Sequence, residues 1–221
     1  MAVIHHTTLK PTKLDLLTAW LPTRPWYAGG PGEPRLSKAG GFRLDDPQGE
    51  VGIEFMVATD TSGPQPVTYL VPLTYRAAPL EGAEHALVGT MEHGVLGPRW
   101  AYDGCQDPVL VAQLVALIEG RAQAQAQSVS ATPDQDVTHS YADDALLPSG
   151  VLTTATDDEE GTELPLAQGT TLRLHRILHA TPEDAPLVPP GATGHVAGAW
   201  DGPDGTRERG LFAVLRSGPR P

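Results

Sequence analysis

The feature that most constrains this chain is an alternation of side chains with a period of two residues. One face of the alternating segment carries Val51, Ile53, Phe55 and Val57. The other face carries Glu50, Gly52, Glu54 and Met56. A helix would spread these positions around its circumference, whereas a strand places every second side chain on the same side. The pattern therefore predicts a half-buried antiparallel strand.

Turn residues on both sides of this segment place further strands beside it. The sequence Asp46-Pro47-Gln48-Gly49 predicts a hairpin with the preceding segment 39–45, and a second turn leads into a strand over Val67–Arg76. Pro72 lacks the N–H that a ladder needs, so we expect this strand at an edge of the sheet. Another strand is predicted over Arg99–Tyr102. Glycine (24) and proline (22) make up about a fifth of the 221 residues, a share that excludes a helical bundle.

A first helix is expected before these strands. Thr12 can cap it and Pro22 ends it. Its apolar face consists of Leu14, Leu17, Trp20 and Leu21.

A second helix is expected after the strands. Asp107 and Pro108 are the residue types of an N-cap and a first helical position, and the helix is predicted to continue from Val109 to Gln127. It is apolar nearly all round between Val111 and Ile118, so we expect deep burial between two layers.

The second half of the chain is predicted to be rich in short strands. A polar segment, Ser128–Asp136, favours a domain boundary between residues 128 and 129. Strands are expected over Gly150–Thr154, Thr170–Leu178, Gly194–Trp200 and Gly210–Leu215, the last two joined by a hairpin turn over Asp201–Thr206. The fold class is therefore α+β: an antiparallel sheet with two helices over residues 1–128, followed by a smaller β-rich unit of four or five strands over residues 129–221. Whether the two units share one continuous sheet stays open.

Charge and cysteine content exclude several kinds of partner and site. The chain has a net charge of −12 and no cluster of Lys and Arg such as a nucleic-acid-binding surface needs. The same negative charge would be repelled by acidic lipids, so neither nucleic acid nor membrane is expected as a partner. The single cysteine, Cys105, excludes a disulfide framework. The N-terminus has no signal-peptide pattern, and a cytoplasmic protein is expected.

Motifs that bind metals, nucleotides or cofactors are missing from the sequence. The eight histidines include no HExxH motif, no GxSxG is present, and no glycine cluster is followed by the Lys of a phosphate-binding loop. We therefore expect no metal, no cofactor and no catalytic residue.

Several segments of the first half resemble a known family. TKLDLLTAWLPTRPWYAG, GGFRLDDPQGEVGIEFMVATD, VPLTYR and HGVLGPRW look like the N-terminal cap domain of actinobacterial maltokinases, over roughly Lys10 to Ser128. The resemblance implies a cystatin-like unit, an antiparallel sheet packed on helices, that sits on a kinase N-lobe. Enzymes of that family transfer the γ-phosphate of ATP to maltose. They use a phosphate-contacting Lys, a catalytic Asp in an HxD-type loop, a downstream Asn and a Mg-binding Asp.

The phosphoryl-transfer residues of that family cannot be carried over to this chain. No His is followed two positions later by Asp, no Lys follows Lys38, and the chain contains no Asn. The first hypothesis is therefore a stand-alone, non-catalytic accessory module that binds a sugar kinase or an α-glucan enzyme, or pairs with itself through a free sheet edge. The alternative is a regulator that binds a sugar or a nucleotide. A third hypothesis, that the chain is an ATP-dependent sugar kinase, rests only on the name of the family that it resembles.

Four residues are the candidates for a binding role: Trp26, His93, Arg99 and Trp100. The two tryptophans fill the core beneath loops in one interpretation, and form a recognition patch in the other. His93 and Arg99 flank Trp100 and, together with Asp103, tie their loop down by hydrogen bonds or contact a ligand.

Overall fold

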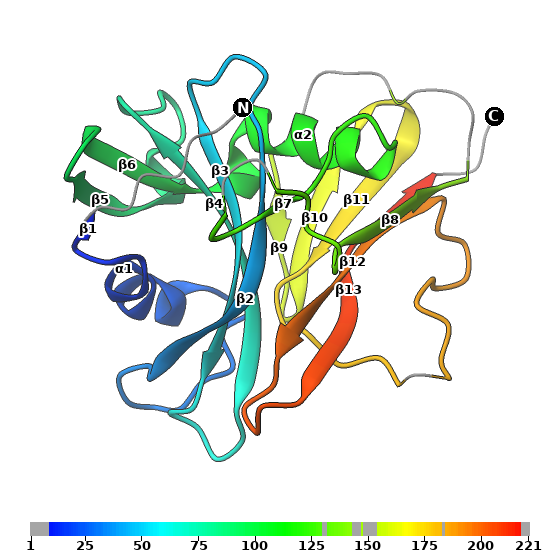
Figure 1. The fold of residues 1–221 in the computed structure, drawn as a ribbon, viewed down its shortest axis with the longest axis horizontal. Helices are drawn as coiled ribbons and strands as arrows, with labels where there is room; N and C mark the ends of the chain where they lie inside the picture. Colours follow the sequence, from blue (N-terminus) through cyan, green and yellow to red (C-terminus); the bar gives the residue numbers. More distant parts are fainter. Residues whose placement is uncertain (1–8, 130–131, 143–146, 148–153, 183, 218–221) are drawn as a thin grey trace.

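The computed structural model describes residues 9–129, 132–142, 147, 154–182 and 184–217. Two antiparallel sheets face each other, with helix α2 (Pro108–Ile118) between them and helix α1 (Lys13–Trp20) on the outer side of the first sheet (Figure 1). The α+β class is confirmed, with two helices and two antiparallel sheets in this part of the chain.

The first sheet has seven strands and contains the predicted hairpins. Their order across the sheet is β1 (Leu9–Lys10), β5 (Leu87–His93), β6 (Gly97–Asp103), β4 (Val67–Arg76), β3 (Gly52–Asp60), β2 (Leu36–Leu44) and β7 (Gln125–Ala126). All of its pairings are antiparallel, and Phe55 of β3 lies between Phe42 of β2 and Pro72 of β4.

Strand β3 is buried on both faces, which corrects the prediction of a half-buried strand. Phe55 and its alternation partners enter the core between the two sheets, as the pattern indicates. Met56, on the opposite face, packs instead with Leu17 and Trp20 of α1. The second face is covered because α1 begins with a capping box between Thr12 and Asp15 and lays its apolar side on the sheet.

Strand β4 is central, so the prediction that Pro72 marks an edge strand is wrong. The N–H of Leu70 points away from β3 and donates to the Arg176 carbonyl at 2.9 Å. By the two-residue period, the nitrogen of Pro72 points to the same side. The pairing of β4 with β6 begins only at Leu73, so Pro72 occupies the gap between two partners of β4, where no ladder hydrogen bond is lost.

Helix α2 begins as predicted and ends earlier than predicted. The Asp107 side chain accepts a hydrogen bond from the Val109 N–H, and Pro108 is the first helical residue. The helix stops at Ile118, because Gly120 adopts a left-handed conformation (φ 73°) that closes the C-terminus. The predicted helical segment up to Gln127 instead contains β7, which pairs with β2.

The second sheet has six strands in the described part of the chain, one more than the upper expectation. Their order is β8 (Thr138–Tyr141), β12 (Gly194–Asp201), β13 (Arg207–Ser217), β11 (Thr170–His175), β10 (Gly161–Pro165) and β9 (Thr156–Asp157). The predicted β12–β13 hairpin is confirmed. Residues 150–153 of the strand predicted over Gly150–Thr154 lie outside the described residues.

The strand predicted over Thr170–Leu178 ends at His175, because the next residues leave the second sheet for the first. The Arg176 carbonyl accepts from Leu70, and the Leu178 N–H donates to the Thr68 carbonyl at 2.8 Å. The backbone of residues 176–178 therefore lies along β4. The two sheets are separate, and they contact each other through this segment.

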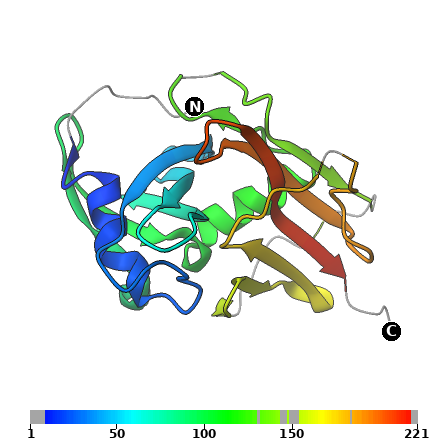
Figure 2. The ribbon, with the colours of Figure 1, turned by 90° about the horizontal axis from the view of Figure 1, so that it is seen from below.

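One apolar core fills the space between the two sheets, which face each other in Figure 2. It contains Phe42 and Phe55 from the first sheet, Phe212 from the second, and six residues of α2: Leu110, Val111, Leu114, Val115, Leu117 and Ile118. The three phenylalanine rings stack with centroid separations of 4.5 and 6.0 Å. The proposed boundary at residues 128 and 129 falls between the last strand of one sheet and the first strand of the other. Independent folding of the second unit stays a prediction.

A buried ion pair also connects the two sheets. Arg176 follows β11 and is 0% exposed. Its Nη2 donates to both carboxylate oxygens of Asp103 in β6, at 2.8 and 2.6 Å, and its Nε donates to Thr162 Oγ1 at 2.7 Å. Its guanidinium also lies 4.9 Å from the Trp26 ring.

Removal of this guanidinium should destabilise the whole protein. Arg176→Ala leaves the Asp103 carboxylate buried without its counter-ion, so we expect a loss of about 3–5 kcal/mol in the free energy of unfolding. Arg207→Ala is the matched control, because Arg207 is about half exposed and pairs with the exposed Asp201 and Asp136. That control should lose less than about 1 kcal/mol. Urea denaturation followed by tryptophan fluorescence measures both, and equal losses would contradict the role of Arg176.

Candidate functional site

Trp26 lies in the core, as the packing interpretation expects. It is 0% exposed and belongs to the cluster between α1 and the first sheet. Its ring meets Trp20 edge-on at 5.7 Å and lies 5.9 Å from Tyr69. In the folded protein Trp26 packs in the core, and its ring lies against the Arg176 guanidinium.

The other three candidates, His93, Arg99 and Trp100, lie together on the β5–β6 hairpin. His93 Nδ1 accepts hydrogen bonds from the N–H groups of Val95 at 3.3 Å and Leu96 at 3.1 Å, which shapes the turn. Arg99 donates to the Pro98 carbonyl at 2.8 Å. Trp100 packs beside the small cluster around Tyr102. His93 thus ties the loop down as predicted.

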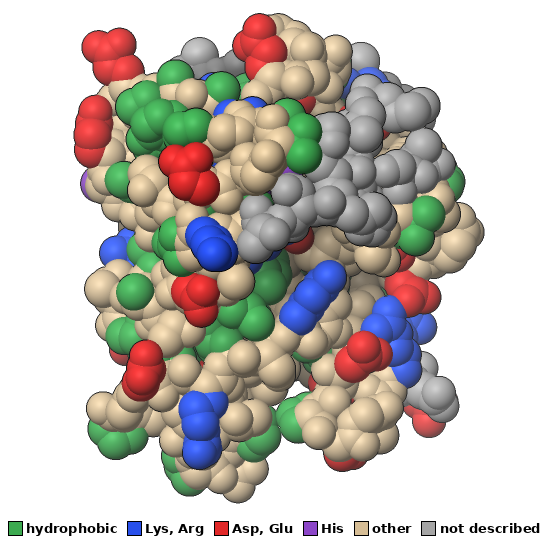
Figure 3. All heavy atoms as spheres, turned by 60° about the vertical axis from the view of Figure 1, so that its left-hand side comes forward, with side chains coloured by type: hydrophobic (Ala, Val, Ile, Leu, Met, Phe, Trp, Pro, Cys, Tyr) green, Lys and Arg blue, Asp and Glu red, His purple; other side chains and the backbone are tan. Residues whose placement is uncertain are grey.

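The tip of this hairpin exposes two adjacent apolar side chains. Val95 is 61% exposed and Leu96 is 45% exposed. They stand between Gly94 and Gly97 in the turn, and Gly97 has a left-handed φ of 72° that a side chain would oppose. On the face that carries α1 and this hairpin, apolar side chains are visible among acidic and basic ones (Figure 3). Sequence reasoning missed Val95 and Leu96, although two apolar residues between turn glycines were a signal for them.

A polar centre around Glu54 fixes α1 to the sheet. The Glu54 carboxylate is buried and accepts from Lys13 Nζ at 2.5 Å, from the Tyr75 hydroxyl at 2.6 Å and from Gln127 Nε2 at 2.6 Å. Burial alone would raise the pKa of Glu54, but the Lys13 ammonium and these hydrogen bonds hold it below its ordinary value. Burial and the neighbouring carboxylate raise the pKa of Tyr75. Both carboxylate oxygens accept hydrogen bonds from the chain itself, so we interpret this centre as structural.

Cys105 is a buried thiol. Burial is the largest cause that raises its pKa, and the nearby Arg176 opposes the shift only in part. The thiolate that a nucleophilic role would need is therefore disfavoured.

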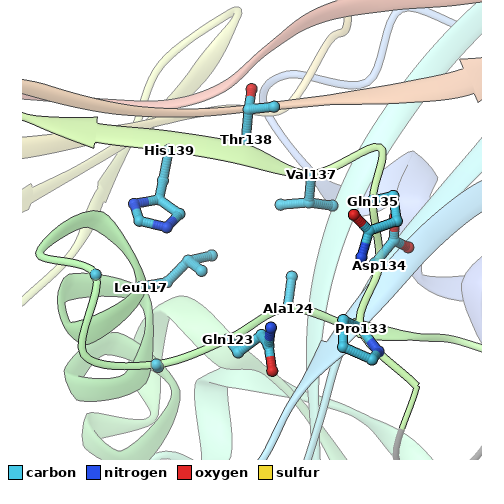
Figure 4. Close-up of a pocket in the computed structure, with 11 residues that line it drawn as sticks. Leu117, Gln123, Ala124, Pro133, Asp134, Gln135, Val137, Thr138 and His139 are labelled. Carbon is cyan, nitrogen blue, oxygen red and sulfur yellow. The ribbon is translucent and has the colours of Figure 1, made fainter.

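A pocket opens where the two sheets meet, and we call it the seam pocket (Figure 4). It encloses about 420 Å³ between the end of α2, the segment 120–124 and the segment 133–139 that leads into β8. His139 lies at one end of the pocket with Leu117 beside it, and Asp134 and Gln135 lie at the other end. Gln123, Ala124 and Val137 lie between these ends.

The comparison with known families concerns the first sheet. Residues 20–107 match the family model of the maltokinase N-terminal cap domain. This part of the chain is similar to that domain, and we call residues 20–107 the cap domain. The cap domain covers β2 to β6, including the hairpin with Val95 and Leu96, and it contains Asp103. It is shorter than the resemblance over Lys10–Ser128 suggested, since α2 and nearly all of α1 lie outside the matched residues. No curated protein matches the chain.

Residues outside the cap domain supply the second sheet, Arg176 and the seam pocket. Among the residues that the structure describes, no group of three or more His, Cys, Asp or Glu side chains is arranged to hold a metal ion. None of the helices in those same ranges is long and apolar enough to cross a membrane.

One buried histidine outside the cap domain should make the free energy of unfolding depend on pH. His195 is 7% exposed, and its Nδ1 lies 2.7 Å from the Ser140 Oγ across the β8–β12 ladder. Burial lowers the pKa of His195, and the charge of His139 lowers it further. The neutral form is therefore favoured in the folded protein.

The stability that neutral His195 contributes should be complete above the unfolded pKa of about 6.5 and should be lost as the pH falls below that value. His195→Gln should weaken this dependence, although His175, whose pKa burial also lowers, retains part of it. Unfolding free energies from urea titrations above and below that pH test this. An unchanged slope in the variant would show that His195 titrates as it does in the unfolded chain.

Proposed function

We propose that this protein is a non-catalytic accessory module that binds another protein of sugar-kinase or α-glucan metabolism. The observation that carries the proposal is the cap domain over residues 20–107, because in the maltokinase family the phosphoryl-transfer groups lie in the lobes that follow the cap. The residues after the cap in this chain form an antiparallel sheet around α2 and include neither lysine nor asparagine. We place the protein in the cytoplasm, which suits its single buried, unpaired cysteine.

The β5–β6 hairpin is the proposed contact surface. Val95 and Leu96 offer adjacent apolar side chains, and Arg99 and Trp100 are residue types that dominate binding energies at interfaces. The hairpin is held by its own ladder and by the His93 hydrogen bonds, so little order is lost when a partner binds. Pairing of a second copy along β8, an edge strand of the second sheet, is the self-association that the proposal allows.

Negative charges introduced at the hairpin tip should weaken the binding of a partner protein. Val95→Asp with Leu96→Asp is expected to weaken the complex with a purified maltokinase or α-glucan enzyme of the same organism by more than about tenfold, as measured by calorimetry. Val188→Asp is the matched control, because Val188 is an exposed apolar residue (42%) outside the cap domain. It should bind like the unmodified protein.

Two results would contradict the proposal. One is a monomer that binds none of these enzymes in analytical ultracentrifugation. The other is sugar-dependent release of ADP from ATP by the purified protein, which would make it a kinase.

A further inference from the structure

The seam pocket differs from the proposed contact surface in position and in chemistry. Its lining residues run from Leu117 to His139, outside the cap domain, and they come from both halves of the chain. The elements that form it, the end of α2, the segments beside it and β8, are not part of the β5–β6 hairpin. We propose that the seam pocket binds a neutral, polyhydroxylated ligand such as a sugar.

The walls of the pocket are fixed by backbone hydrogen bonds. The Ala126 N–H donates to the Thr132 carbonyl at 2.7 Å, and the Asp134 N–H donates to the Ala124 carbonyl at 2.9 Å. The opposite wall is β8, which pairs with β12 from Thr138 to Tyr141. A site held by ladders loses little conformational freedom when a ligand enters, so even a few hydrogen bonds can give measurable affinity.

The polar groups of the pocket both donate and accept hydrogen bonds. The side-chain amides of Gln123 and Gln135 each carry a donor and an acceptor. The Asp134 carboxylate accepts, and it already receives the Asp136 N–H at 2.9 Å, which fixes its orientation. A hydroxyl group also donates and accepts, so a ligand rich in hydroxyls can satisfy this set without an unpaired polar atom.

The centre of the pocket is apolar. Leu117 and Ala124 are buried and Val137 is half-buried; Ala124 and Val137 lie between the polar ends, and Leu117 lies beside His139 (Figure 4). A sugar ring has C–H groups on its faces and hydroxyls at its rim, which matches an apolar centre with polar ends. Ligand sites commonly combine an apolar lining with a few polar groups that fix orientation.

The charge of the lining favours a neutral ligand over a phosphorylated one. Among the described residues that line the pocket there is neither Lys nor Arg, and Asp134 supplies their one carboxylate. Phosphate groups are bound in proteins by Arg, Lys or convergent backbone N–H groups, and the carboxylate would repel them. Nucleotides and sugar phosphates are therefore expected to bind more weakly than the corresponding neutral sugars.

Residue-resolved NMR titration of the intact chain tests both the position and the ligand class. Maltose, trehalose or glucose should shift the backbone amide signals of residues 117–124 and 133–139, and glucose 6-phosphate should shift them less. No shift with any of the neutral sugars at their highest soluble concentration would overturn the proposal. Shifts confined to other strands, or stronger binding of the phosphate, would overturn it as well.

A double variant tests the role of the two amides. Gln123→Ala with Gln135→Ala removes two exposed side chains and should preserve the fold, and we expect sugar affinity to fall by at least about tenfold. Gln65→Ala, at an exposed glutamine in the β3–β4 turn, is the control and should bind like the unmodified protein. Equal affinity in all three proteins would refute the assignment. Val95→Asp with Leu96→Asp should leave sugar binding unchanged, so a failure of partner binding and a failure of this proposal give different results.

Discussion

The ion pair between Arg176 and Asp103 joins two parts of the protein that lie 73 residues apart in the chain. Two charges in the interior are tolerated only when they are paired and hydrogen-bonded. Thr162 accepts from the guanidinium and the Trp26 ring lies against it, whereas its buried Nη1 has no hydrogen-bond partner among the described residues. The same Asp103 carboxylate accepts the Cys105 N–H at 3.1 Å, which turns the chain from β6 towards α2. The Asp103 carboxylate thus positions both the C-terminal end of the cap domain and the segment around Arg176 that follows β11.

Features set by neighbouring residues were predictable from the sequence. The alternation around Phe55, the cap at Thr12 and the Asp107–Pro108 start of α2 depend on local geometry, and the structure contains all three. Features set by distant residues were not predictable. Pro72 is tolerated in a central strand because it falls between two distant partners of β4, the Arg176 carbonyl that Leu70 contacts and the β6 pairing that begins at Leu73.

The candidate sites divide in the same way. His93, Arg99 and Trp100 are close in sequence and lie on one hairpin, so a single local prediction was enough to group them. The seam pocket was not predictable, because its walls are placed by the hydrogen bonds of residues 124–126 with residues 132–134 and by the pairing of β8 with β12. Trp26 has the residue type of a recognition site, but its burial depends on α1 and β4, which cover it from other parts of the chain.

The shared core around α2 and the Arg176–Asp103 ion pair should make the cap domain and the second sheet unfold as one cooperative structure. Native-state hydrogen exchange, read for the amides of β4 and of β13 in the same sample, tests it most directly. We predict that the slowest amides of both strands exchange with the same free energy, equal to that of global unfolding. A lower opening free energy for β13 alone would show that the second sheet unfolds independently, and it would contradict the claim.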